Sequence, residues 1–277
     1  MKKSIQLILA VVSIAFLFSA CNKVDEDYYF PKVKLASIKS DDYTATFKYD
    51  KKKLSQILMD DETITVIYND NKQISELDCS VDNEKVLMTY NDDKKITRCD
   101  YYKGANLLYY QEFVRSGDHI ASVRTYGSSD DWKKISQGKL FRMCFNTTLI
   151  DKVIKNAPKA DLTLTTEEFW TYSGTNVSLI TSSVTYAGVT ATMKTAYTYD
   201  EKHNPFYGLP YYIGQTMAYS TNNATSMISS FVLGNTTTTT DTQYFTYTYN
   251  DDDYPTVLTT SATQGGSTDN IMTFSYE

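Results

Sequence analysis

Few residues in this chain have the side chains that catalysis at neutral pH usually requires. The 277 residues include only two histidines, His119 and His203, and each lies in a stretch typical of a hairpin turn. No Cys/His spacing fits a zinc site, and the sequence has neither a nucleophile-elbow motif nor a glycine-rich phosphate loop. We therefore expect no metal and no cofactor, and we interpret both histidines as solvated turn residues.

Carboxylates provide the remaining route to enzymatic chemistry. A glycosidase needs two of them facing a cleft, and Glu76, Asp78, Glu167 and Glu168 are possible members of such a pair. Nothing in the sequence pairs them, so we predict a non-enzymatic protein that binds a ligand or a partner or has a structural role. The alternatives are a glycan-acting hydrolase and a periplasmic carrier of an apolar ligand. The net charge of −6 argues against a nucleic-acid partner, because phosphate binding needs a basic face.

Aromatic side chains suggest ligand binding instead. The chain has 24 tyrosines, and tyrosine rings contact sugars and apolar ligands, although in a Tyr-rich sheet most rings simply cover the core. The tyrosines that are candidates for such contacts are Tyr101, Tyr102, Tyr109, Tyr110, Tyr211 and Tyr212.

The stretch 205–212 is the most distinctive aromatic segment. It is irregular, and Pro205 and Pro210 stiffen it, which lowers the entropy lost on binding. One hypothesis is that this loop lines the mouth of a β-shell and contacts a glycan or an apolar ligand; the other is that it is a buried structural turn. The predicted contact residues are Phe206, Tyr207, Tyr211 and Tyr212.

A repeated hairpin positions these residues. In the stretch 64–79, Ile64, Val66 and Tyr68 alternate along a β-strand, polar turn residues follow, and a second apolar strand begins at Ile74. A spacing of about 20 residues between copies indicates a β-array. Further copies, some of them degenerate, begin at Tyr49, Tyr90, Val114, Tyr172, Tyr199 and Tyr249.

The predicted fold is all-β, an antiparallel meander of about fourteen to eighteen strands curled or closed into a barrel-like shell. One short helix is expected at 147–157, where Leu149, Ile150 and Val153 lie on one helical face. The predicted single domain is 32–277, with halves 32–144 and 159–277 on either side of this helix.

Two resemblances bear on the fold. The repeated hairpin resembles the YD repeats of RHS-type β-shell proteins, because the copies at Tyr49, Tyr68 and Tyr90 have Tyr followed by Asp or Asn, then a polar turn, then Leu or Ile. The stretch 199–208 is similar to the signature of Bacteroidetes-type outer-membrane lipoproteins with a domain of unknown function of porin-like β fold. This second resemblance implies a β-shell and an envelope location, and it implies no activity.

The N-terminus is typical of a lipoprotein. Residues 1–20 have a basic start and an apolar core too short to span a bilayer as a helix, so they are interpreted as a signal peptide. Phe18-Ser19-Ala20-Cys21 resembles a bacterial lipobox, which implies acylation of Cys21 and membrane attachment through its acyl chains. The acidic tether 21–31 resembles an export signal, which favours the cell surface over the periplasmic face of the outer membrane.

Charge along the strands distinguishes a tethered barrel from a membrane-spanning one. Lys72, Asp78, Lys95 and Arg98 lie on both expected strand faces, whereas a transmembrane barrel needs a continuous apolar lipid face. We therefore predict a soluble body held by lipid.

Two cysteines test the order of the strands. Cys79 and Cys99 are expected to have one strand between them, about 9–10 Å apart, beyond disulfide reach. They should remain unbridged and buried.

Overall fold

The computed structural model describes residues 33–41, 43–59, 62–79, 82–127, 163–186, 189–209, 215–233 and 236–277. Several predicted features lie outside these residues: the signal peptide, Cys21 and its tether, the helix at 147–157, Tyr211 and Tyr212.

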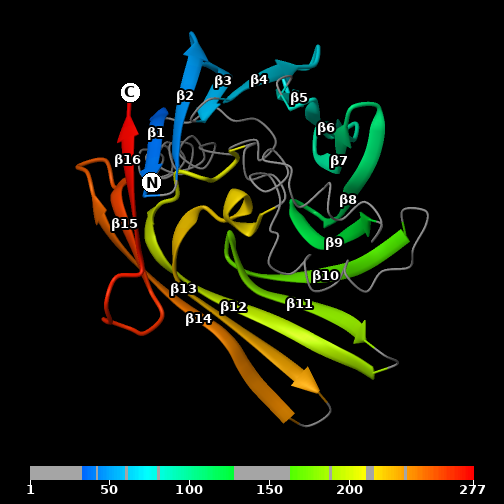
Figure 1. Cartoon of the computed structure of the whole chain (residues 1–277), viewed down its shortest axis with the longest axis vertical. Helices are drawn as coiled ribbons and strands as arrows, with labels where there is room; N and C mark the ends of the chain where they lie inside the picture. The colour runs from blue at the N-terminus through cyan, green and yellow to red at the C-terminus, as the bar shows by residue number, and fades with distance from the viewer. Residues whose placement is uncertain are drawn as a thin grey trace, which may run out of the picture.

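The described residues form a closed barrel of sixteen antiparallel strands in sequence order, with the last strand paired to the first (Figure 1). The prediction of an antiparallel meander curled or closed into a shell is confirmed. The first nine strands are β1 (Leu35–Ser40), β2 (Thr44–Asp50), β3 (Lys53–Met59), β4 (Glu62–Tyr68), β5 (Ile74–Cys79), β6 (Glu84–Tyr90), β7 (Ile96–Lys103), β8 (Asn106–Ser116) and β9 (His119–Gly127). The others are β10 (Thr163–Ser173), β11 (Asn176–Tyr186), β12 (Val189–His203), β13 (Asn222–Leu233), β14 (Thr236–Tyr249), β15 (Pro255–Ser261) and β16 (Asn270–Tyr276).

The Tyr-turn hairpins share a bulge beside the tyrosine, and three of them also close their turns in the same way. In three of them the asparagine after the tyrosine accepts a hydrogen bond from the backbone N–H four residues on; the distances are 3.0 Å for Asn69, 2.8 Å for Asn91 and 2.9 Å for Asn250. The pairing register shifts beside each tyrosine, for example between Ile67 and Tyr68. Such a bulge matches a turn that contains a residue in the left-handed region, which here is Lys72 at φ 67°.

The repeat tyrosines connect neighbouring hairpins at one end of the barrel. The repeat tyrosine Tyr249 donates to the Asp200 carboxylate. Five other tyrosine hydroxyls each donate to the carbonyl oxygen of the first or second residue of an earlier strand, so one hairpin satisfies a polar group of the hairpin before it. The bonds are Tyr49 to Leu35 (3.0 Å), Tyr68 to Leu54 (2.8 Å), Tyr90 to Ile74 (2.6 Å), Tyr199 to Val177 (2.6 Å) and Tyr276 to Pro255 (2.7 Å). In the degenerate copy Arg115 takes this place and donates to Ile96.

The barrel is mainly apolar inside and polar outside over β1–β7. Side chains alternate between the two faces, and the inward row Val66, Leu77, Val86 and Tyr101 is buried. The outward row Thr65, Asp78, Lys85 and Tyr102 runs beside it. No helix in the described part of the chain is long and apolar enough to cross a membrane.

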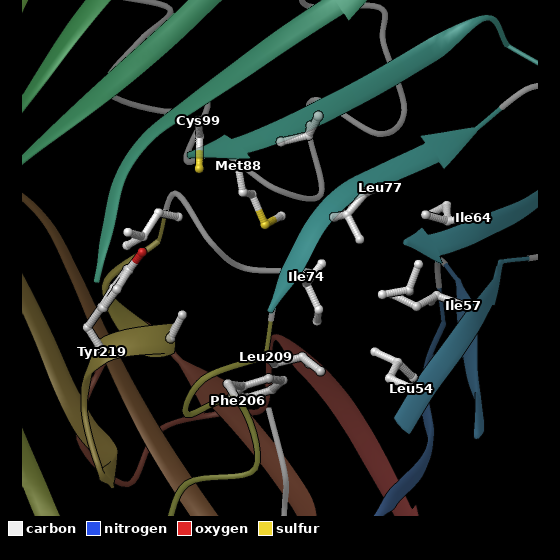
Figure 2. Packing of buried hydrophobic residues seen from close by; sticks show 14 of the residues in the cluster. Leu54, Ile57, Ile64, Ile74, Leu77, Met88, Cys99, Phe206, Leu209 and Tyr219 are labelled. Carbon is white, nitrogen blue, oxygen red and sulfur yellow. The ribbon is translucent and has the colours of Figure 1, made fainter. Parts of the chain in front are cut away.

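The connection between β12 and β13 fills part of the interior. It includes the 3-10 turn η2 (Thr216–Tyr219), which lies inside the ring of strands in Figure 1. Figure 2 shows Phe206 and Leu209 facing Leu54 and Ile74, all members of one buried cluster. This part of the barrel therefore has a packed core.

The two described cysteines belong to the same core. Cys79 ends β5, Cys99 lies in β7, and β6 separates them. Neither forms a disulfide and both residues are fully buried, so the prediction of two unbridged, buried cysteines is confirmed.

Candidate functional site

The predicted ligand-contact loop is divided between the core and residues outside the description. Phe206 is 7% exposed, and its ring meets Phe274 of β16 edge-on at 5.7 Å between centroids. Tyr207 is partly exposed, and Tyr211 and Tyr212 lie outside the described residues. The described half of the loop is thus packed into the barrel, with Phe206 unavailable as an exposed contact.

Asn204 holds this loop in place. Its side-chain amide donates to the carbonyl oxygens of Met217 (2.8 Å) and Ser220 (2.7 Å), and its Oδ1 accepts from the N–H of Phe206 at 2.9 Å. Gly208 lies at φ 71°, and its N–H donates to Ala218 at 2.8 Å. The two sides of the connection are thereby joined before they enter the core.

The interior wall changes from apolar to polar between β7 and β8. One inward row reads Met88, Cys99, Gln111, Thr125 and Thr166 across β6 to β10. We call the inward-facing polar side chains of β8–β12 the polar wall. Its buried members are Gln111, Thr125, Thr166, Ser182 and Thr195, and its half-buried member is Glu168.

Two atoms of the polar wall have no hydrogen-bond partner among the described residues. They are Oε1 of Gln111, whose side chain is 5% exposed, and Oγ1 of Thr166, which is 7% exposed. The other end of the Gln111 amide donates to Thr125 Oγ1 at 3.3 Å. Buried polar atoms are paired in the great majority of cases, and an unpaired one calls for an explanation such as a water or a ligand.

Glu168 is the titratable group of the wall. Burial raises the pKa of its carboxyl, and a hydrogen bond from Trp170 Nε1 at 3.3 Å opposes that rise. A group of this kind holds its proton to higher pH than an exposed glutamate and then donates a hydrogen bond.

Aromatic side chains surround this carboxyl. Burial raises the pKa of Tyr197 to about 12, a hydrogen bond to Thr216 lowers it, and the charge of Glu168 raises it further. Burial also raises the pKa of Tyr109, with Glu168 adding to the effect. Trp170 meets Tyr219 of η2 edge-on at 5.5 Å, so the β12–β13 connection reaches the polar wall.

The remaining tyrosine candidates divide by strand face. Tyr101 and Tyr109 point inward and are fully buried. Tyr102 and Tyr110 lie on the outer face, where the Tyr110 ring stacks between Tyr126 (4.3 Å) and the Arg98 guanidinium (3.7 Å). Both ring faces of Tyr110 are therefore already in contact with protein.

The structure does not bring the four candidate carboxylates together. Glu76, Asp78 and Glu167 lie on the outer face, and Glu167 accepts from Arg124 at 2.8 Å. Glu168 points to the interior from the adjacent position of β10. Neighbouring residues of one strand face opposite ways, so Glu167 and Glu168 cannot form a hydrolytic pair.

One group of possible metal ligands occurs among the described residues. Glu62, Cys79 and Asp82 place a carboxylate, a thiol and a carboxylate within 4.8 Å of one another at the end of the barrel opposite the tyrosine turns. Burial, then the charges of neighbouring acids, raises the pKa of the Cys79 thiol, while a backbone hydrogen bond lowers it. The two histidines lie apart from this group, against Tyr172 and Tyr254.

The polar wall was not predicted from the sequence. Gln111, Thr125 and Thr166 are ordinary strand residues, and only the register places them in one row facing inward. A usable signal was the alternation in β8, where Tyr109, Gln111 and Phe113 share the buried face, so that a polar residue occupies a core position.

Comparison with known proteins gives a fold. No protein-family model and no curated protein matches the chain. A solved porin-like protein from Bacteroides uniformis ATCC 8492 is 12% identical, with a TM-score of 0.51, covering 90% of this chain and 100% of its own. Another, from Bacteroides vulgatus ATCC 8482, is 10% identical, with a TM-score of 0.44, covering 89% of this chain and 99% of its own. The chain thus has the fold of a porin-like barrel protein, and at this identity the likeness concerns the fold alone.

Proposed function

We propose that this chain is a lipid-anchored, non-enzymatic binding protein of the outer membrane. In this proposal the acyl chains on Cys21 hold it in the membrane, and the barrel stands in water at the cell surface. The observation that carries the proposal is the polarity of the barrel, which is mainly apolar inside over β1–β7 and charged outside over β7–β10.

The outer face is unsuited to lipid. Across β7 to β10 an outward row reads Arg98, Glu112, Arg124 and Glu167, with alternating charge. Ion pairs join the row at 3.6 Å between Arg98 and Glu112 and at 2.8 Å between Arg124 and Glu167. Each Arg or Lys on a lipid face costs about 2–4 kcal/mol at the bilayer midplane, so this face supports a barrel in water.

The arrangement of acids supports binding over hydrolysis. Three of the four nominated carboxylates lie on the outer face and only Glu168 points inward, while the polar wall offers hydrogen-bonding groups inside the barrel. A binding protein needs only such groups in a fixed frame, and a closed β-barrel supplies a rigid one.

Two measurements on the natural chain test the anchor and the barrel separately. The chain from Asn22 onward should purify as a folded β-protein without detergent, as judged by circular dichroism and size-exclusion chromatography. Full-length protein should incorporate labelled palmitate and fractionate with membranes, and C21A should lose both properties. Recovery of the Asn22 chain only in detergent micelles would overturn the water-facing barrel, and palmitate incorporation by C21A would overturn the anchor.

Protease treatment of intact cells tests the location. Degradation of the barrel without lysis is the expected result, and protection until the outer membrane is permeabilised would assign the protein to the periplasmic face.

A further inference from the structure

We propose that the polar wall binds a small, uncharged, polyhydroxylated molecule of the sugar class inside the barrel. This inference rests on the proposed binding function and specifies the ligand chemistry for it. The observations that carry it are the unpartnered Gln111 Oε1 and Thr166 Oγ1, which lie on one inward face of β8–β10.

The unpaired atoms require a ligand with hydrogen-bonding groups. Gln111 Oε1 is an acceptor and needs a donor, while the Thr166 hydroxyl both donates and accepts. An apolar ligand would leave both atoms unpaired in a desolvated setting, which is unfavourable. A hydroxyl group satisfies either kind of partner, so a polyol can pair with both atoms.

The charges of the same region argue for a neutral ligand. Two of the four Lys and Arg residues of β8–β12, Arg124 and Lys194, lie on the outer face of the barrel. The other two are already engaged at the turns: Arg115 donates to the carbonyl oxygens of Ile96 and Asp118, and Lys202 pairs with Asp253 at 2.7 Å. Glu168 is the acidic group of the wall, and burial favours its neutral form. A charged ligand would therefore enter the interior without an opposite charge from these strands, at a high desolvation cost.

Aromatic rings complete the environment. Trp170 and Tyr197 flank Glu168 on the inward face of β10 and β12, and Tyr219 of η2 packs against Trp170 at 5.5 Å. Aromatic rings combine an apolar body with a polar edge, which suits the mixed C–H and O–H surface of a sugar ring. The site therefore offers an acceptor, hydroxyls, a carboxyl and aromatic surface together.

The test uses the chain from Asn22 onward and a panel of neutral saccharides: glucose, galactose, N-acetylglucosamine and maltotriose. Binding is measured by calorimetry, with N-phenyl-1-naphthylamine as a neutral apolar probe. T166V removes the unpartnered hydroxyl at nearly constant shape, and Q111M removes the unpartnered acceptor. T171V makes the same substitution on the exposed face of the same strand and serves as the matched control.

At least one saccharide should bind to the wild-type chain, and T166V and Q111M should each weaken binding at least about fivefold, the effect of one lost hydrogen bond. T171V should bind like wild type. Circular dichroism checks that each variant is folded, and T166V loses no hydrogen bond to described residues, so its fold should persist.

Three results would overturn the inference. The first is that no saccharide binds at millimolar concentration, which would mean that only water molecules pair with Gln111 Oε1 and Thr166 Oγ1. The second is saccharide binding that T166V and Q111M do not weaken. The third is binding of the apolar probe alone. None of these results bears on solubility or palmitate incorporation, so the proposed anchor and barrel are tested independently.

Discussion

At the scale of single residues, the barrel interior contains a carboxyl in an environment that favours its neutral form. Glu168 points inward from β10, and burial is the largest cause of its raised pKa. Its partner Trp170 donates to the carboxyl whether the proton is present or absent. An amide in the same place would keep that bond and would carry no charge to bury.

We therefore predict that E168Q stabilises the protein at neutral pH. Below the ordinary value of 4.5 the carboxyl is protonated in both the folded and unfolded states, so the variant and wild type should melt alike. As pH rises above 4.5, the unfolded chain releases the proton first and the folded wild type loses stability until its own higher pKa is passed. Each tenfold difference in proton affinity between the folded and the unfolded chain changes the free energy of unfolding by about 1.4 kcal/mol. For a chain of this size that shifts Tm by about 3–6 °C.

Melting curves of both proteins across that pH range check the prediction. A constant difference in Tm at all pH values would show that the effect of the substitution is packing and not proton binding. If E168Q melted below wild type at neutral pH but not at low pH, the folded chain would be stabilising the ionised carboxyl of Glu168.

At the scale of elements, the hairpin repeat is held together by the tyrosine hydroxyls. Tyr90 donates to Ile74 at 2.6 Å from one hairpin to the preceding one, and its ring packs against the core. The tyrosine thus does two structural tasks, which accounts for its recurrence before each turn without any role in ligand binding.

Y90F should cost about 1 kcal/mol of unfolding free energy, because it removes one hydrogen bond and leaves the ring in place. Y68F should cost about as much, since its bond to Leu54 is similar. Y244F is the control: this side chain lies on the outer face of β14 and makes no hydrogen bond to the described residues. Equilibrium denaturation in urea measures all three, and equal losses in Y90F and Y244F would contradict the structural role.

The β12–β13 connection allows the two hypotheses for the loop to be separated. F206A should cost about 3–5 kcal/mol, the usual effect of removing a core aromatic ring, because Phe206 packs against Phe274. Y211A and Y212A should hardly change Tm if these rings are exposed at a ligand site. A loss of about 3 kcal/mol or more for either tyrosine would mean that the whole loop is structural, and its proposed ligand contacts would then be wrong.

At the scale of the whole molecule, closure makes the strands depend on one another. β1 pairs with both β2 and β16, so every strand has two neighbours and no edge is exposed. No strand can separate without breaking two ladders. This arrangement favours a single cooperative unfolding transition.

Cys79 and Cys99 report on that transition. Both are reduced and fully buried, so an alkylating reagent should modify them only when the barrel opens. Their labelling in urea should follow the loss of β-structure seen by circular dichroism, with one midpoint. Labelling at lower urea would show that β5–β7 opens alone, and a Cys79–Cys99 disulfide found by mass spectrometry would contradict the order of the strands.

Several features followed from the sequence alone because they depend on local chemistry. β-Branched and aromatic residues in alternation, followed by Asn and Asp turns, determine where each strand begins and ends. The repeat then indicates an antiparallel array, and its length indicates a sheet that curls or closes, whereas the pairing of β1 with β16 that closes it came only from the structure. The buried state of Cys79 and Cys99 followed from the same pattern.

The polar wall and the buried position of Phe206 were decided only by the tertiary structure. Gln111 and Thr166 are 55 residues apart in the chain, and they share a row because β8, β9 and β10 pair in one register. A slip of one residue would turn every side chain of a strand to the other face, so the sequence of one strand cannot say which polar residue meets which. Likewise, the barrel has to close before the β12–β13 connection has an interior to fill.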